Sequence, residues 1–498
     1  MTARPTLSRT ARAARSIQRE VGEAAGHAFG SAIDRAVGAH HARRLRKVGW
    51  EHALAAEGRE WARGGTPARP GNAVEVLIDG ASFLPKVAEE LARAESHVHL
   101  SGCFFSPELE LTRGADPTIV RNLLAELADR IDVRVLIWRG APIPIFSPSR
   151  REVRKMVERF NLRNRIHCEF DSCVRFMHCH HEKTIVIDDR IAFVGGIDLT
   201  LDGGDPYDSP EHPPRGVIGW HDVAMRIEGP AVADVAEQFR LRWQAAANED
   251  LPVPRAPDTV GDVEVQIVRT IPEKVYERSL PQGDFSVLES YVGAFRSAER
   301  FIYIENQFLW SPEIVELLAE KLREPPRDDF RIVVLLPVNA NDGADISRGQ
   351  VAALIHADNG NARFLACSVY ARTGSLRDPI YVHAKVAIVD DCWLTIGSAN
   401  LNEHSLFNDS EVNVVTHDER LARDTRLRLW SEHLELPIEE IDGDPATVID
   451  ERWEPISEEQ LDRLQNDLPL THRLVKLPGV SVRHRRLLGA LQGRIYDA

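Results

Sequence analysis

Two copies of one short motif set the strongest constraint on how this chain folds. Each copy reads His-x-Lys-x4-Asp, and the copies occupy residues 181–188 and 383–390. In an extended strand, residues two apart project to the same face, so each histidine lies beside its lysine. The stretch after each lysine is apolar, which is typical of a strand buried on both faces inside a layered α/β core. One copy would indicate little, but two copies predict a single site built from both.

The duplication extends beyond the motif itself. Three further stretches recur in the same order, and they pair residues 96–107 with 300–312, 133–138 with 331–336, and 195–198 with 397–400. The last pair is a glycine turn that begins seven residues after each motif aspartate. Strands therefore alternate with helical segments such as 84–95 and 312–323. This pattern predicts an α/β fold of two similar domains, each with a central mixed sheet.

In this ordered set of motifs, the chain resembles the phospholipase D superfamily, and specifically its eukaryotic-type branch. The resemblance covers roughly residues 75–440. Beyond the two motifs it rests on His180–Lys183, Phe193–Leu199, Trp220–Asp222, Glu228–Pro230, Ile302–Gln307, Ile396–Asn400 and Leu429–His433. The resemblance implies two domains packed with pseudo-twofold symmetry, with both His-x-Lys pairs meeting at their interface.

The length of 498 residues is too great for one core and fits two domains with extensions. We expect four segments: a basic amphipathic N-terminal extension over 1–70, a first phospholipase D-like half over 71–255, a second such half over 256–440, and a C-terminal cap over 441–498.

Cleavage of a phosphodiester needs a nucleophile, a proton for the departing oxygen and positive charge for the phosphoryl oxygens. Two histidines and two lysines meet this need. The resemblance implies that His181 is the nucleophile, forming a phosphohistidine, and that His383 is the general acid and base. Near-symmetry gives the sequence alone no way to choose between them. Lys183 and Lys385 would hold the phosphate, with Asn400 donating a hydrogen bond.

Each histidine also needs an orienting partner on its other ring nitrogen. The resemblance implies a carboxylate on a later strand of each half, and the matching residues are Asp222 and Glu411. The motif aspartates Asp188 and Asp390 lie five residues beyond their lysines, and we interpret them as scaffold that closes the strand and its turn.

The two glycine turns supply the predicted substrate-binding residues, which are Gly196 and Asp198 in the first half and Ser398 and Asn400 in the second. Asp198 breaks the symmetry, because it stands where the second half has Asn400. A carboxylate repels a phosphate unless it is protonated or paired, so we rank Asp198 below Asn400.

Composition limits the classes of function. The net charge of −15 opposes general nucleic-acid binding, because phosphate backbones favour a positive surface. No apolar run approaches the roughly 18 residues that span a bilayer, and the six cysteines give no disulfide framework. Residues 173–181 contain three histidines and two cysteines, but zinc sites favour paired ligands from two separate segments. We expect a cytoplasmic protein without a metal or another cofactor, although export by a signal-independent route stays open.

Two segments are candidates for contact with a membrane surface. Residues 1–50 carry ten Arg or Lys against three Asp or Glu. Apolar residues recur there at every fourth position: Ile17, Val21, Ala25, Phe29, Ile33 and Val37. Such a basic helix either lies on an anionic membrane or packs on the catalytic body, and the sequence leaves both open. The loop Pro142–Phe146 is likewise either interfacial or buried against the second half.

The resemblance implies a phospholipase D that contacts the membrane peripherally. Its substrate would be a glycerophospholipid, whose distal phosphodiester is hydrolysed to phosphatidic acid and a free head group or transferred to another alcohol. The alternatives keep the catalytic centre and change the substrate, to a cardiolipin synthase-like phosphatidyltransferase or a phospholipase D-family nuclease. A catalytically silent membrane-binding module is a third possibility, which two intact motifs disfavour.

Overall fold

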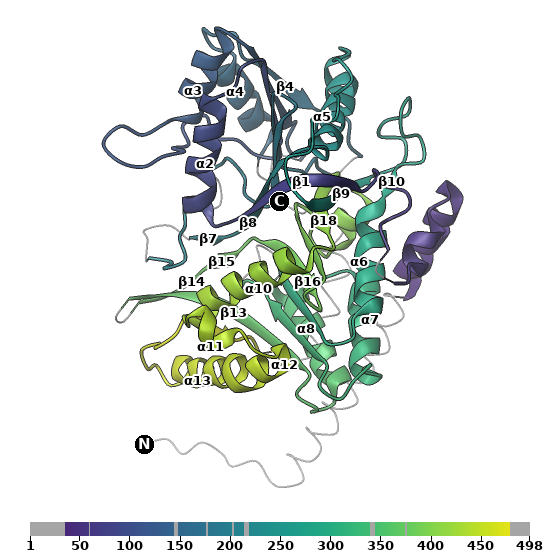
Figure 1. Cartoon of the computed structure of the whole chain (residues 1–498), viewed down its shortest axis with the longest axis vertical. Helices are drawn as coiled ribbons and strands as arrows, with labels where there is room; N and C mark the ends of the chain where they lie inside the picture. The colour runs from purple at the N-terminus through teal and green to yellow at the C-terminus, as the bar shows by residue number, and fades with distance from the viewer. Residues whose placement is uncertain are drawn as a thin grey trace, which may run out of the picture.

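The computed structural model of the chain consists of two α/β halves that lie one above the other in Figure 1, the first in purple to teal and the second in teal to yellow. The structure describes residues 35–58, 60–143, 148–175, 178–201, 204–213, 219–338, 344–373 and 376–478. In this view the helices of the first half lie to the left and right of its strands, and those of the second half lie on its right side and towards the bottom.

The first half contains a seven-stranded mixed sheet. Its strands are β1 (Arg69–Ile78), β2 (His97–Gly102), β3 (Asp132–Trp138), β4 (His167–Asp171), β5 (Thr184–Ile187), β6 (Ile191–Gly195) and β8 (Val223–Glu228). They pair in the order β1-β8-β6-β5-β2-β3-β4. The neighbours β2, β3 and β4 are parallel and the other pairs are antiparallel.

The second half repeats this topology strand for strand. Its strands are β9 (Val263–Ile271), β11 (Phe301–Asn306), β12 (Arg331–Leu335), β13 (Phe364–Thr373), β16 (Lys385–Val389), β17 (Trp393–Gly397) and β18 (Glu411–Thr416). Their order is β9-β18-β17-β16-β11-β12-β13, with β11, β12 and β13 parallel. An antiparallel pairing of β1 with β9 joins the two sheets. The prediction of two similar α/β units with mixed sheets is therefore confirmed.

Helices cover both faces of each sheet because the central strands are buried on both sides. In the first half these are α2 (Gly80–Ala92), α3 (Val120–Ala128), α4 (Arg150–Phe160) and α5 (Val232–Ala247). Their counterparts are α6 (Ser286–Ser297), α7 (Pro312–Arg323), α8 (Ala344–Asp358) and α10 (Glu419–Leu434). The first three helices of each set pack on one face of their sheet, while α5 and α10 pack on the opposite faces.

The faces covered by α5 and α10 belong to one hydrophobic cluster. This cluster joins Val186 and Val194 of the first sheet to Val386 and Ile388 of the second. Because this apolar layer is shared, the two halves fix each other's position, and residues at their boundary are held from both sides.

The remaining elements are short apart from the 12-residue helix α13. They are η1 (Glu51–Ala55), β7 (Trp220–His221), β10 (Asp284–Phe285), β14 (Leu376–Pro379), β15 (Tyr381–Val382), α9 (Glu403–Phe407), α11 (Ile438–Ile441), α12 (Pro445–Val448), η2 (Ile449–Trp453), α13 (Glu454–Gln465) and β19 (Leu474–Lys476). Two of them tie parts of the chain together: β7 pairs in parallel with β15 across the halves, and β19 pairs with β13.

Part of the expected membrane-contact surface lies outside the described residues, including the helix expected before residue 35 and the loop residues Ile145 and Phe146. Residues 35–48 are helical and are held to the second half, where Arg44 forms an ion pair with Glu273 at 2.7 Å. The loop residue Ile143 is 40% exposed. Within the part of the chain that the structure describes, no helix combines the length and apolar character needed to cross a bilayer.

Candidate active site

The backbone of each His-x-Lys segment is hydrogen-bonded to the opposite half. The amide of His181 donates to the carbonyl of Ser410 at 3.0 Å, and the amide of His383 donates to the carbonyl of His221 at 2.8 Å. Each motif therefore enters its strand, β5 or β16, with its histidine fixed by the other half. Both motif histidines and both lysines are at most 6% exposed.

His181 is oriented by a carboxylate of the second half. Its Nδ1 lies 3.0 Å from Oε1 of Glu411 and 3.1 Å from the carbonyl oxygen of Ser398. The hydroxyl groups of Ser398 and Ser405 both donate to Glu411, which fixes the carboxylate. This arrangement holds the imidazole of His181 in one orientation through its Nδ1 atom.

His383 is oriented by the first half in the mirrored way. Its Nδ1 lies 2.6 Å from Oδ2 of Asp222, and the backbone of Gly196 also hydrogen-bonds the ring. A Cβ atom at Gly196 would lie 2.1 Å from Oδ1 of Asp222, so a side chain at this turn position would displace the carboxylate. The Trp220 ring packs on the His383 ring with 4.5 Å between centroids.

The two lysines differ in their partners. Nζ of Lys183 forms an ion pair with Oδ2 of Asp198 at 3.1 Å. Nζ of Lys385 instead donates to Oε1 of Gln307 at 3.1 Å, and Nδ2 of Asn400 donates to the same oxygen at 3.2 Å. Asp198 is therefore the carboxylate partner of a lysine, while Asn400 belongs to a neutral hydrogen-bonding group around the other.

This difference sets the charge on each side. Burial lowers the pKa of Lys385 to about 8. For Lys183 burial acts in the same direction, but the nearby charges, led by that of Asp198, outweigh it and raise the pKa. Burial and the positive charges of Lys385, Lys183 and His181 lower the pKa of His383 well below its usual range. All four groups therefore act on one another within a single site.

The orienting carboxylates also have unusual pKa values. Burial raises the pKa of Glu411 to about 8 and that of Asp222 to about 6. Both shifts reflect the cost of holding an anion away from water, which nearby Lys183 and Lys385 offset only in part.

The motif aspartates Asp188 and Asp390 bind backbone rather than the histidines or lysines. Asp188 accepts from the amides of Glu95, Ser96 and His97, at the start of β2. Asp390 accepts from the amides of Glu299, Arg300 and Phe301, at the start of β11. Both aspartates adopt positive φ angles, 57° and 55°, in the turn that follows their strand.

Gln307 comes from the strand end Glu305–Gln307, for which the family resemblance implies a place near the active-site mouth, and it contacts two residues of the candidate site. It joins Lys385 to Asn400 and donates through Nε2 to the hydroxyl of Tyr381 at 2.7 Å. Its signal in the sequence was its position at the end of the stretch Ile302–Gln307, whose counterpart in the first half ends at Cys103.

Three groups of side chains could hold a metal ion among the described residues. One contains His178, from the segment 173–181, which lies 3.2 Å from Asp409 and 3.3 Å from His404. The second half supplies both of these partners, which the sequence did not bring together with His178. The other two groups share His221 and lie behind Asp222.

Comparisons with known proteins agree with this geometry. The family described as "Phospholipase D" matches residues 214–316, and the family described as "Cardiolipin synthase, PLD-like domain" matches residues 291–431. Phospholipase D A of Dictyostelium discoideum is 27% identical over 74% of this chain, and phospholipase D1 of Schizosaccharomyces pombe is 26% identical over 74%. This chain spans 36% of the length of each of these two relatives.

Among solved structures, a phosphatidylserine synthase from Haemophilus influenzae Rd KW20 aligns over 79% of this chain and 93% of its own, with 13% identity and a TM-score of 0.47. The family matches together cover residues from both halves, and the curated relatives span most of the chain. The chain is therefore similar to the phospholipase D superfamily, and these two curated relatives are eukaryotic phospholipases D.

Proposed function

We propose that this protein is a phospholipase D. It cleaves the distal phosphodiester of a glycerophospholipid and passes the phosphatidyl group to water or to another alcohol. The observation that carries the proposal is the exchange of carboxylates between the halves, in which Glu411 orients His181 and Asp222 orients His383. Two buried imidazoles held in this way, beside two lysines, supply a nucleophile, a general acid and a binding site for an anion.

In the first step, Nε2 of His181 attacks phosphorus and the bond from phosphorus to the head-group oxygen breaks. His383 gives its proton to that oxygen, so a neutral alcohol leaves and a phosphatidyl-histidine remains. In the second step, His383 takes a proton from water or an alcohol, whose oxygen attacks phosphorus. The bond from phosphorus to nitrogen breaks, and His181 is restored with phosphatidic acid or a phosphatidyl-alcohol as product.

The low pKa of His383 is compatible with its role as an acid. The cations Lys385, Lys183 and His181 contribute to that low value. A bound phosphodiester anion offsets their repulsion, so the substrate itself raises the pKa of His383 and favours its protonated form. Lys385 and Asn400 then face the phosphoryl oxygens, and Lys183 with Asp198 completes the other side.

A small cavity beside Lys183 and Asp198 is lined mainly by apolar side chains, among them Phe104, Phe105, Phe193 and Ile197. We propose residues 71–255 and 256–440 as the two halves of the catalytic unit, with 1–70 as an extension, 441–498 as a cap, and peripheral contact with a membrane in the cytoplasm.

The match of residues 291–431 to the cardiolipin synthase family favours a second candidate, phosphatidyl transfer onto phosphatidylglycerol. The same two steps produce cardiolipin if the attacking alcohol is the head group of another lipid. The chemistry is unchanged, and only the acceptor differs.

One experiment separates these candidates. The purified chain is incubated with liposomes of phosphatidylcholine, with and without ethanol, and in parallel with liposomes of phosphatidylglycerol. Phosphatidic acid and phosphatidylethanol support the phospholipase, whereas cardiolipin supports the transferase. His181→Ala and His383→Ala are the controls. Absence of all three products from active-site-intact protein, or cleavage of single-stranded DNA instead, would contradict the proposal.

A further inference from the structure

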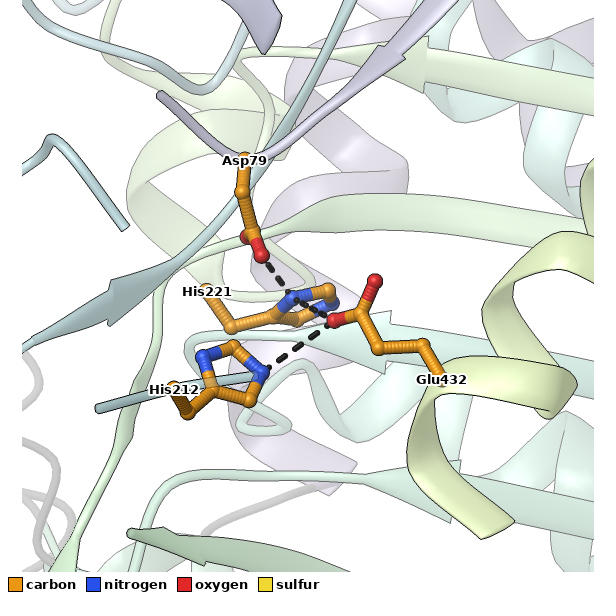
Figure 2. Close-up of side chains that lie close together, drawn as sticks. All are labelled: Asp79, His212, His221 and Glu432. Carbon is orange, nitrogen blue, oxygen red and sulfur yellow. Dashed lines mark hydrogen bonds and ion pairs between the residues drawn. The ribbon is translucent and has the colours of Figure 1, made fainter. Parts of the chain in front are cut away.

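A second cluster of buried histidines and carboxylates lies behind the active site (Figure 2). It consists of Asp79, which precedes α2, His212 in the stretch 204–213, His221 on β7, and Glu432 near the end of α10. The first three belong to the first half and Glu432 belongs to the second. Figure 2 shows the four side chains converging on one point, and none is more than 9% exposed.

The distances within the cluster resemble those of a tetrahedral metal site. Nδ1 of His221 lies 3.0 Å from Oδ1 of Asp79 and 3.1 Å from Oε1 of Glu432. Nε2 of His212 lies 3.1 Å from the same Glu432 oxygen. The ligand atoms of a tetrahedral zinc ion lie about 3.3 Å apart, given bonds of about 2.0–2.1 Å. These three distances are each within a few tenths of an ångström of that value, and all four ligand atoms lie within 4.8 Å of one another.

Each histidine has a second carboxylate on the ring nitrogen that faces away from the cluster. Nε2 of His221 lies 2.9 Å from Oε2 of Glu305, and Nδ1 of His212 lies 3.1 Å from Oδ2 of Asp208. Histidines that ligate metals usually have a carboxylate beside their other ring nitrogen, to which the ring N–H donates. With a metal on the inner nitrogen, the outer nitrogen of His221 would carry the proton and donate it to Glu305.

Charge and unsatisfied polar atoms also point to a cation. Metal binding requires both imidazoles to be neutral. In that state they and the two carboxylates carry a charge of −2, which a divalent ion balances in a region shielded from water. Oδ2 of Asp79 is buried and has no hydrogen-bond partner among the described residues. Asp79 and His212 also adopt φ angles of 61° and 41°, which non-glycine residues rarely take and which the surrounding structure must hold in place.

We propose that Asp79, His212, His221 and Glu432 bind one divalent transition-metal ion of the zinc class. Two nitrogen and two oxygen ligands in a closed, buried site suit zinc better than calcium or magnesium, which prefer oxygen ligands in larger numbers. The group of His178, His404 and Asp409 offers fewer ligands, and Asp409 already accepts hydrogen bonds from the amide and thiol of Cys179.

The site would act on the catalytic residues through Asp222. This residue follows His221 directly, and its amide donates to Oδ1 of Asp79 at 3.2 Å. The carbonyl of His221 accepts from the amide of His383. A metal ion at this point ties α10 to β7 and holds the carboxylate that orients His383, so its role is positioning rather than chemistry.

The test measures metal content and does not depend on activity. The full chain is produced without a polyhistidine tag in zinc-containing medium, passed through metal-free buffer and analysed by mass spectrometry for metals. We expect about one zinc ion per chain, as for a structural zinc site. His212→Asn and Glu432→Gln should lose the ion. His99→Asn is the matched control, because His99 is also largely buried and faces a single carboxylate, Asp132.

A folded chain with less than about one-tenth of an ion, before and after incubation with zinc, would overturn the proposal. Protons on both histidines would then hold the cluster together. Retention of zinc by both variants would overturn it as well.

A milder variant keeps the test decisive if the first two do not fold. Asp208→Asn leaves the four ligands in place and should weaken zinc binding about 10-fold to 100-fold in competition with a chromophoric chelator. Unchanged affinity would contradict the assignment. In crystals of the intact chain, anomalous scattering at the zinc edge should give a peak between the four side chains, and a peak only beside His178 would contradict it.

Discussion

The two halves of the active site share one backbone plan but differ in charge. In the first, Lys183 is paired with Asp198, and Gly196 leaves room for the short side chain of Asp222. In the second, Lys385 has the neutral partner Gln307, and Ser398 donates to the longer side chain of Glu411. Because each carboxylate orients the histidine of the opposite half, neither half contains a complete unit.

The difference suggests a division of labour. Lys385 donates to the neutral side chain of Gln307 rather than forming an ion pair like that of Lys183, so we expect its side to be the stronger binding site for the phosphoryl oxygens. The side of Lys183 is closer to neutral, because Asp198 is paired with the lysine. This suits a role for His181 in attacking phosphorus rather than in binding the phosphoryl oxygens.

Variants of the two histidines should differ in which step of the reaction they can still perform. His181→Ala and His383→Ala should each lower turnover of phosphatidylcholine by about 10⁴-fold or more, as for other residues that act as a unit. With a p-nitrophenyl phosphodiester, whose leaving group needs no acid, His383→Ala should still release one equivalent of p-nitrophenol and trap an adduct on His181. Mass spectrometry of the quenched protein locates the adduct. An adduct formed by His181→Ala would reverse the assignment.

The turn residues should respond unequally to exchange. Asn400→Asp puts a carboxylate beside Lys385 and should lower kcat/KM by about 10²-fold, comparable to the loss of one donor to a developing anion. Asp198→Asn removes a negative charge from the other side and should change kcat/KM by less than about 10-fold. Steady-state kinetics on a short-chain lipid, with melting temperatures as the folding control, make the comparison. Equal losses would contradict the asymmetry.

The pH dependence of kcat/KM should reflect the ionisation of two buried groups, one that orients His181 and one beside Asn400. The pKa of Glu411 is raised to about 8, so below that pH it becomes protonated and His181 loses its carboxylate partner. The pKa of Lys385 is lowered to about 8, so above that pH its charge is lost. We expect kcat/KM to rise towards pH 8 and to fall above it, by up to about 10-fold per pH unit on each limb.

A soluble phosphodiester is the appropriate substrate for this measurement, because it stays anionic over the whole pH range. A profile that is flat from about pH 6 to about pH 10 would show that neither group controls the free enzyme.

The smallest effect on activity should come from the motif aspartates. Asp390→Ala removes the acceptor of three backbone amides and should lower the free energy of unfolding by about 1–3 kcal/mol. Asp390→Asn should cost less, because asparagine tolerates the positive φ angle. Chemical denaturation measures both variants. A large loss of kcat with unchanged stability would contradict a scaffold role.

Much of the fold could be predicted from the sequence because the duplication is visible in it. Buried strands such as Thr184–Ile187 and Lys385–Val389 are apolar after their first residue, and the distance in sequence from the strand end to the glycine turn is the same in both halves. The pairing of each carboxylate with the histidine of the opposite half could not be predicted, because it depends on how β7 and the residues before β18 cross the interface.

The sequence by itself determined the family, the repeated α/β plan and the residue types available for phosphodiester chemistry, because these depend on local order and spacing. Only the tertiary structure decided which side chains meet. Asp198 gains Lys183 as its partner, Gln307 joins Lys385 to Asn400, and residues as far apart as Asp79 and Glu432 converge on one buried point. The physical reason is that a buried charge must find its partner across the packed halves, and packing sets those distances, not sequence separation.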